Sequence, residues 1–380
     1  MNFYYGVMII FIMLVWGHLI VKFFYRTDIS PAKSLEIDGL RGLLALGVFV
    51  AHAAISYRYY QGIPWQLPIE NFYTMIGEGS VLFFFMITGF LFWNMIIRYR
   101  GVLNPWVFVQ HRFLRLAPMF IFSFILIQLV AIYFSEYSLY TLAGRSGEYL
   151  VHILHFDGIS LDITEIPNKL LINASVYWTL EYEWKFYLII LVLAFLYRTV
   201  LRHWIWFPLL LLVIIKIVLG QSNIWIIFPF GMLAASIKHA LEEKNIIPTR
   251  MQKLFFNLFS IPFLVFILSD FHDGFNLLWY ALGFLLFLLI VSGYVDFFGL
   301  LHLRTTVFLG SISYSVYLLH GIWLYTVLNI LKRYIDFKTL GLEAYWLIIA
   351  VLGMVMIVSA TFTYKFIEEK FYNLRSRMES

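Results

Sequence analysis

The feature that most constrains this chain is a succession of apolar runs, each long enough or nearly long enough to cross a lipid bilayer. A transmembrane α-helix needs about 20 predominantly apolar residues. Of the 380 residues, 62% are hydrophobic and 13% are charged, whereas about a quarter are charged in a soluble domain. We therefore predict an all-α fold, a polytopic transmembrane helical bundle of about 11 helices. The eleven runs lie near residues 3–24, 41–57, 79–97, 116–134, 177–197, 204–220, 223–238, 254–270, 276–292, 307–330 and 344–366.

Charged residues between the runs predict which helix ends face the cytoplasm. Segment 98–115 carries four arginines and no acid, whereas segment 135–176 carries five acids against Arg145 and Lys169. Among the later connecting segments, every second one is again rich in basic residues. Because cytoplasmic loops carry an excess of Lys and Arg, we expect an N-terminus outside and a cytoplasmic C-terminus. The expected location is the plasma membrane, which in a bacterium is the inner membrane.

Composition excludes several other classes of protein. The net charge of +5 comes largely from basic loop residues, so we expect a bilayer as partner and no nucleic acid. The chain has no cysteine, which excludes disulfides and a cysteine thioester intermediate, and we expect no metal site. The first apolar run lacks a basic start and a small-residue cleavage site, which favours a retained helix over a cleaved signal.

Two ionisable residues of the second run lie far apart along one predicted helix. Arg41 and His52 are eleven residues apart, which corresponds to about 16 Å of helix rise. One side chain can therefore stay at a membrane surface while the other lies deep. Ionisable groups at depth are costly and usually carry function, although a flanking positive charge and a hydrogen-bonded core histidine would give the same pattern.

Three further clusters combine polar residues with apolar sequence. Arg112 and Arg115 share one face if their segment is helical, and guanidinium groups bind phosphate bidentately, although positive-inside signalling alone would also place them there. The segment 178–187 carries three charges, which either have partners in the bundle or anchor the helix at the interface. The segment 309–320 carries a stripe of Ser and Tyr that ends on His320.

These segments resemble the motifs of the membrane acyltransferase-3 family, which transfers acyl groups to sugars and other acceptors. The family's basic residue, ten residues and a histidine correspond to Arg41 and His52. Its second core helix, which ends in Ser-Gly-Phe-Leu, resembles residues 79–91. Its Phe-x-x-Arg-Arg-x-x-Arg loop resembles residues 108–115, where His111 stands at the first arginine position.

The remaining motifs follow in the family's order. Its Trp-Ser-Leu-x-x-Glu-x-x-Phe-Tyr segment resembles residues 178–187 and selects Glu183. Its Leu-Gly-x-x-Ser-Tyr-x-x-Tyr-x-x-His segment is matched in full by residues 309–320. Residues 366–371 resemble its Ile-Glu-Lys-Pro-Phe ending, with one glutamate inserted and no proline. The resemblance covers roughly residues 33–374.

The resemblance implies an acyl-coenzyme A donor, most often acetyl-CoA, as a co-substrate supplied from the cytoplasm, with no permanently bound cofactor. The donor's phosphates would meet Arg112, Arg115 and Arg41, and its pantetheine arm would thread up the bundle toward His52. His52 could then take the proton of an acceptor hydroxyl. Without a cysteine, we expect that hydroxyl to attack the thioester directly.

The other residues of these motifs have alternative roles in the reaction. The resemblance implies that Glu183 orients a histidine or binds sugar hydroxyls at the outer mouth, and His320 is the rival base. A serine acyl-enzyme at Ser313 or Ser315 is the alternative to direct attack. We further expect three residues of these motifs to contact the substrate: Ser313, Tyr314 and Trp178.

The resemblance also predicts the division of the chain and its function. Residues 1–32 would form an N-terminal transmembrane helix and linker, 33–374 the acyltransferase-3-like domain with its ten-helix core, and 375–380 a cytoplasmic tail, without a hydrolase-like domain. We predict an integral membrane O-acyltransferase that moves an acetyl group from acetyl-CoA to a sugar hydroxyl of a cell-surface polysaccharide or a glycolipid. The alternatives are a transporter or flippase of a glycan, and an acyltransferase acting on a small molecule or peptidoglycan.

Overall fold

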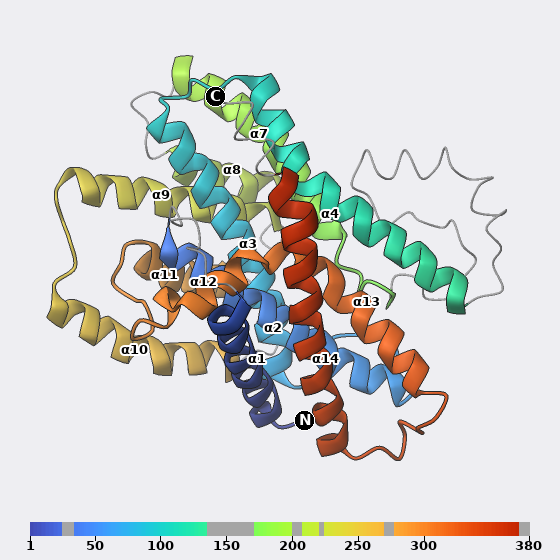
Figure 1. The fold of residues 1–380 in the computed structure, drawn as a ribbon. Helices are drawn as coiled ribbons and strands as arrows, with labels where there is room; N and C mark the ends of the chain where they lie inside the picture. The colour runs from blue at the N-terminus through green and yellow to red at the C-terminus, as the bar shows by residue number, and fades with distance from the viewer. Residues whose placement is uncertain (25–33, 135–170, 200–206, 220–223, 270–276, 372–380) are drawn as a thin grey trace.

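The computed structural model describes residues 1–24, 34–134, 171–199, 207–219, 224–269 and 277–371, which form an all-helical bundle (Figure 1). This confirms the predicted all-α fold. The α-helices of these ranges are α1 (Phe3–Phe24), α2 (Leu35–Tyr60), α3 (Asn71–Arg98), α4 (Pro105–Phe134), α7 (Trp178–Thr199), α8 (Phe207–Leu219), α9 (Ile227–Glu243), α10 (Arg250–Ser269), α11 (Leu277–Val291), α12 (Arg304–Ser311), α13 (Ser313–Leu331) and α14 (Leu342–Thr363). Short helical turns are η2 (Ile224–Ile226), η3 (Leu300–His302) and η4 (Tyr364–Glu368).

The described part of each apolar run is helical, and several helices begin before the predicted bounds, such as α2 at Leu35 and α3 at Asn71. Two differences matter for the site. The run 307–330 is divided at Ile312 into α12 and α13. Helix α4 begins at Pro105 rather than near residue 116. The Asn104 side-chain oxygen accepts hydrogen bonds from the next backbone N–H groups, those of Trp106 and Val107, and proline suits a first helical position. The two loop arginines of the sequence analysis therefore lie within a helix.

Eight of the described helices are long and apolar enough to cross a membrane, fewer than the eleven runs. Helices α8 and α11 have 13 and 15 residues, and so rise about 20 and 22 Å against a hydrocarbon core of about 30 Å. Helix α7 has 22 residues, but its charged residues lower its hydropathy. The protein is a multi-pass membrane protein.

Several predicted segments between and beyond the apolar runs lie partly or wholly outside the described residues. They include the linker that precedes residue 33, the acidic segment 135–176 up to residue 170, and the tail 375–380. Helix α1 lies beside α14 (Figure 1), where Trp16 Nε1 donates a hydrogen bond to the Met354 carbonyl oxygen, 3.1 Å away.

Glycines allow two pairs of helices to cross at backbone contact. Where α3 crosses α9, a Cβ added to Gly89 would overlap the Phe228 carbonyl oxygen, and one added to Gly231 would overlap that of Met86. Where α2 crosses α12, a Cβ at Gly310 would overlap the Asp38 carbonyl oxygen. Small residues at such crossings are typical of membrane bundles, in which close packing replaces the hydrophobic effect.

The ends of neighbouring helices gather on two opposite faces of the bundle. Arg98, the last residue of α3, and Lys238 of α9 line one shared cavity, and we call the surface around them the Arg98 face. At the other end of α3, Asn71 Nδ2 donates a hydrogen bond to the Ser269 carbonyl oxygen, 2.9 Å away. We call that surface the Asn71 face.

Gly89 and Gly79 of α3 form a matched pair that tests the crossings. We expect Gly89→Ala to destabilise the protein, because overpacking of this kind costs about 1–3 kcal/mol. A Cβ at Gly79 would meet no atom within 4 Å, so Gly79→Ala should leave the melting temperature of the detergent-purified protein unchanged or raise it through helix propensity. Equal melting temperatures for the two variants would show that the close approach at Gly89 does not stabilise the fold.

Candidate active site

A long cavity of about 870 Å³ runs into the bundle from the Arg98 face, a volume typical of ligand sites. Helices α2, α3, α4, α7 and α13 contribute most of its wall. Along α3 its lining extends from Arg98 back to Val81, which is about 25 Å of helix. We call it the large cavity.

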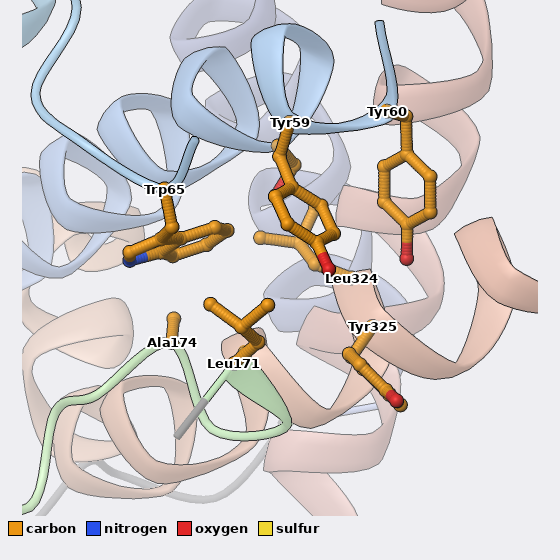
Figure 2. Close-up of a pocket in the computed structure, with 9 residues that line it drawn as sticks. Tyr59, Tyr60, Trp65, Leu171, Ala174, Leu324 and Tyr325 are labelled. Atoms are coloured by element: carbon orange, nitrogen blue, oxygen red, sulfur yellow. The ribbon is translucent and has the colours of Figure 1, made fainter. Parts of the chain in front are cut away.

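A second, much smaller cavity lies toward the Asn71 face (Figure 2). Tyr59 and Trp65 line it from the end of α2 and the segment that follows, and Leu324 and Tyr325 line it from α13. We call it the small cavity.

The large cavity brings the three predicted arginines together with Glu183. Arg41, Arg112 and Arg115 all line it, and the Glu183 carboxylate lies within electrostatic reach of each of them. Glu183 therefore lies with the arginines rather than at the outer mouth, where we expected it. It accepts a hydrogen bond from Tyr187, which also lines the cavity.

Glu181 and Glu183 face different ways although they are two residues apart. This separation is about 200° around a helix. Glu181 lies on the other side of α7 from the cavity and pairs with Lys185, four residues later. The exposed pair suits the surface of the bundle, whereas Glu183 faces the arginines.

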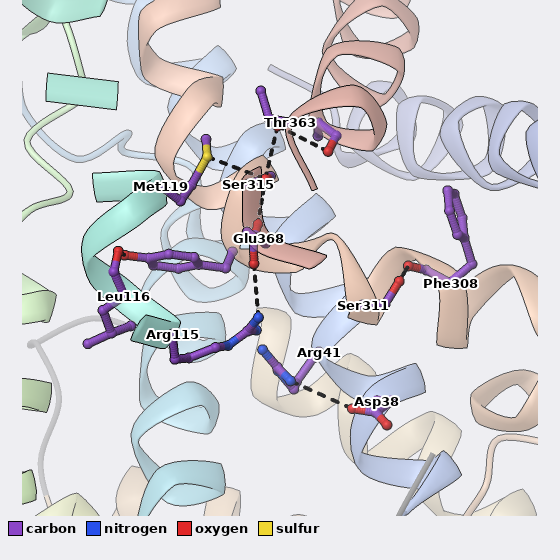
Figure 3. Close-up of polar contacts among 12 residues, drawn as sticks. Asp38, Arg41, Arg115, Leu116, Met119, Phe308, Ser311, Ser315, Thr363 and Glu368 are labelled. Carbon is purple, nitrogen blue, oxygen red and sulfur yellow. Dashed lines mark hydrogen bonds and ion pairs between the residues drawn. The ribbon is translucent and has the colours of Figure 1, made fainter. Parts of the chain in front are cut away.

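Arg115 forms a partly buried ion pair that links three parts of the bundle (Figure 3). Its Nη1 lies 2.9 Å from Glu368 Oε2, and Glu368 is only 4% exposed. The hydroxyl of Ser315 donates to Glu368 Oε1, 2.5 Å away, and Thr363 Oγ1 donates to Ser315 Oγ, 3.0 Å away. Glu368 belongs to the π-helical turn η4, a rare conformation that often occurs at functional sites.

The other two arginines are held by different interactions. Arg41 Nη1 lies 3.6 Å from Asp38 Oδ1, three residues earlier on α2. The Arg112 guanidinium lies 5.0 Å from the centre of the Phe92 ring and 5.8 Å from that of Tyr187, distances at which cation–π attraction operates.

The three residues expected to contact the substrate have different surroundings. Ser313 lines the large cavity, and its buried hydroxyl has no hydrogen-bond partner among the described residues. Tyr314 lines it too, and its hydroxyl donates to the Leu116 carbonyl oxygen, 2.9 Å away. Trp178 packs against Phe85 instead, with ring centres 6.1 Å apart, and is not among the residues that line the cavity.

The two histidines that the sequence analysis treated as rivals touch each other. His320 Nε2 lies 3.0 Å from His52 Nδ1. His320 is fully buried, whereas His52 is partly accessible and its ring is stacked 6.3 Å from that of Trp65. We call His52 and His320 the histidine pair.

Backbone carbonyls determine which ring nitrogens of the pair carry hydrogen. His320 Nδ1 faces the Val316 carbonyl oxygen at 3.3 Å, and His52 Nδ1 faces that of Val48 at 3.1 Å. A carbonyl oxygen only accepts, so both Nδ1 atoms carry hydrogen, and in the neutral rings both Nε2 atoms are acceptors. His52 Nδ1–H is then shared between Val48 and His320 Nε2, which leaves the lone pair of His52 Nε2 available to a ligand.

The histidine pair lies between the two cavities. On α13, Tyr317 lines the large cavity one turn before His320, and Gly321 lines the small cavity directly after it. On α2, Arg41 lines the large cavity and Ser56, one turn beyond His52, lines the small one. Neither histidine is among the residues that line the two cavities, and the pair adjoins them through Tyr317 on one side and through Ser56 and Gly321 on the other.

A protein-family model described as an acyltransferase domain matches residues 34–365. The chain belongs to the acyltransferase-3 family. This confirms the resemblance, and it makes the protein a membrane acyltransferase. Comparison with curated proteins and with solved structures gave no match.

Two polar residues of this acyltransferase site were missed by the sequence analysis. Glu368 lies in the motif at 366–371, and an acid beside a long apolar run was a signal that it needs a buried partner. Asp38 had the weaker signal of lying three residues before an arginine on one helix. Among the described residues, no group of three or more His, Asp or Glu side chains gathers to hold a metal ion.

Glu368 and its neighbour Glu369 offer a direct test of the partly buried ion pair. We expect Glu368→Ala to destabilise the acyltransferase by about 1.5–3 kcal/mol, because it removes a hydrogen bond between charged groups from the partly buried Arg115. Glu369→Ala should change stability by less than about 0.5 kcal/mol, because no described residue pairs with Glu369. Thermal unfolding of both purified variants measures this, and similar losses in the two would rule out a stabilising pair.

Proposed function

We propose that this acyltransferase moves an acetyl group from acetyl-CoA to the hydroxyl of a sugar on a cell-surface polysaccharide or a lipid-linked glycan. The observation that carries the proposal is the histidine pair, with an available lone pair on His52 Nε2, one helical turn beyond Tyr317 of the arginine-lined cavity. The nature of the acceptor rests on the family alone.

The large cavity suits the donor's phosphates at its Arg98 end. Arg41, Arg112 and Arg115 line it, and the ion pairs with Asp38 and Glu368 fix two of them in place. Each guanidinium has five N–H donors, so those not used within the protein can bind phosphate oxygens. The basic residues at the Arg98 face, such as Arg98 and Lys238, support a cytoplasmic location for this face. The N-terminus would then be outside and the C-terminus inside.

The reaction needs one proton acceptor and no covalent enzyme intermediate. The acceptor hydroxyl gives its proton to His52 Nε2 as its oxygen attacks the thioester carbonyl carbon. A carbon–oxygen bond forms, the carbon–sulfur bond breaks, and the departing sulfur takes the proton back from the imidazolium. His320 accepts the hydrogen bond of His52 Nδ1 and so holds the ring with Nε2 toward the substrate.

Transfer of labelled acetyl separates this function from transport of a glycan. Purified protein supplied with labelled acetyl-CoA and a glycan extract should release free CoA and place the label on the glycan. Movement of an acceptor across a vesicle membrane without any loss of acetyl from CoA would favour a transporter instead.

His52 should be needed for chemistry and not for donor binding. We expect His52→Ala to lower kcat by about 10²–10⁴-fold, the usual contribution of a positioned general base, with acetyl-CoA affinity nearly unchanged. Alanine suits a helix, so the variant should still fold. Steady-state kinetics and donor binding by calorimetry test both points.

The matched variant is His320→Ala, which removes the partner of His52 and leaves the base itself. It should lower kcat less than His52→Ala. A larger loss in His320→Ala, with His52→Ala near wild type, would transfer the role of the base to His320.

Arg112 should govern the affinity for the donor. We expect Arg112→Ala to raise the KM for acetyl-CoA about tenfold to a hundredfold, because a hydrogen bond to a charged group contributes about 1.5–3 kcal/mol. The KM for the acceptor should change little. Arg100 is exposed and does not line the large cavity, so Arg100→Ala is the matched control, and equal donor KM values in the two variants would remove Arg112 from the donor site.

Glu183 should matter for transfer and Glu181 should not. We expect Glu183→Gln to reduce acetyl transfer strongly, because it removes the negative charge that faces the three arginines. Glu181→Gln alters only an exposed pair with Lys185, whose contribution is small. The measurement is transfer activity at equal protein levels in membranes, and the opposite ranking would mean that the cavity-facing side of α7 does not serve the reaction.

A further inference from the structure

The small cavity lies one helical turn beyond His52 along α2 and directly after His320 along α13, where Ser56 and Gly321 line it. Its volume is about 10 Å³, which is room for about one water molecule. Trp65 and Tyr59 line it with their rings 5.9 Å apart and nearly perpendicular, and Trp65 also stacks on His52. Figure 2 shows Tyr59, Trp65 and Leu171 around this space.

Ser56 contributes a polar side chain to the lining of the small cavity. Ser56 is 3% exposed and lines the cavity one helical turn beyond His52. Its hydroxyl makes no hydrogen bond to any residue in the described part of the chain. A buried hydroxyl left unpaired costs free energy, so this group is suited to a polar atom of a ligand.

One wall of the small cavity includes Ala174, which belongs to a turn packed against α13. Ala174 and Ser175 both have left-handed backbones, with φ of 54° and 58°, which is strained for residues other than glycine. The Asn173 side chain supports this turn by accepting a hydrogen bond from the Ser175 N–H, 3.0 Å away. The turn lies against α13 at Gly321, where a Cβ would overlap the backbone of Asn173 and Ala174.

We propose that the small cavity receives the attacking hydroxyl of the acceptor and that its size selects primary hydroxyls. The inference rests on the proposed acetyl transfer. A hydroxymethyl arm is narrow enough to reach a space for one water-sized group, whereas a hydroxyl fixed on a sugar ring brings its ring carbons with it. Ser56 Oγ–H donates to the entering oxygen, and the hydroxyl proton points to His52 Nε2.

The reaction balances within this arrangement. The primary oxygen forms its bond to the acetyl carbon as its proton passes to His52 Nε2. The bond from that carbon to the CoA sulfur breaks, and the sulfur leaves with the proton as free CoA. The products are a primary acetyl ester and the CoA thiol.

Two sugars that differ in one group test the selection. Purified protein receives labelled acetyl-CoA with methyl α-D-glucopyranoside, which carries one primary hydroxyl, or with methyl α-D-xylopyranoside, which has the same ring without the hydroxymethyl arm. We expect acetyl on the primary oxygen of the glucoside and none on the xyloside, as read by mass spectrometry and NMR. Acetylation of the xyloside, or of a ring hydroxyl of the glucoside, would overturn the inference.

A glycan extract used as acceptor distinguishes two outcomes: failure of the selection for primary hydroxyls, and failure of the proposed acetyl transfer itself. Label on a primary hydroxyl of the extract supports the selection even when neither simple sugar reacts. Label on a secondary hydroxyl overturns the selection and leaves acetyl transfer intact. Release of no CoA and transfer of no label with any of these acceptors would overturn the proposed function itself.

Substitutions of Ser56 test whether the small cavity binds the acceptor. We expect Ser56→Ala to raise the acceptor KM about two- to tenfold, the value of one hydrogen bond, with the KM for acetyl-CoA unchanged. Ser56→Val also fills the space and should reduce transfer much further while donor binding is retained. Ser80 is a buried serine of α3 that bonds to the Ile76 carbonyl oxygen and lines neither cavity, so Ser80→Ala is the control. An unchanged acceptor KM in Ser56→Ala would remove Ser56 from the acceptor site.

Discussion

The ion pair between Arg115 and Glu368 is the interaction on which the large cavity depends. An unpaired charge is costly inside an apolar bundle, so the ion pair brings α4 together with η4, the turn that follows α14. The hydrogen bond from Ser315 to the same carboxylate brings the start of α13 to that point. Three segments far apart in the sequence are thereby joined at the wall of one cavity.

The division of α12 from α13 serves the same arrangement. The break at Ile312 lets Gly310 pack against the α2 backbone while Ser313 and Tyr314 line the large cavity. Helix α13 then continues past His320 to the small cavity. Because α2 spans the same depth from Arg41 to His52, the two helices hold the histidine pair between the cavities.

Much of this fold could be predicted because the bilayer fixes the length of a spanning segment. The apolar runs, the separation of Arg41 from His52 and the opposite directions of Glu181 and Glu183 follow from helix geometry alone. The early start of α4 could also have been predicted from the sequence, because an asparagine followed by a proline is typical of a helix start.

Contacts between distant helices could not be predicted in this way. The sequence shows that Arg115, Glu368 and the two histidines are polar groups in apolar surroundings, but spacing along the chain does not say which of them meet. The sequence also did not show that Glu183 lies beside the three arginines, because the neighbours of α7 decide which cavity its residues line.

The central claim is that the large cavity carries an acyl donor from the arginines to the histidine pair. A cryo-EM structure with a non-hydrolysable analogue of acetyl-CoA tests this most directly. The account predicts phosphate oxygens within hydrogen-bond distance of Arg112 or Arg115 and the acyl carbonyl carbon beside His52 Nε2. An analogue bound outside the large cavity, or one whose acyl end lies away from the histidine pair, would contradict it.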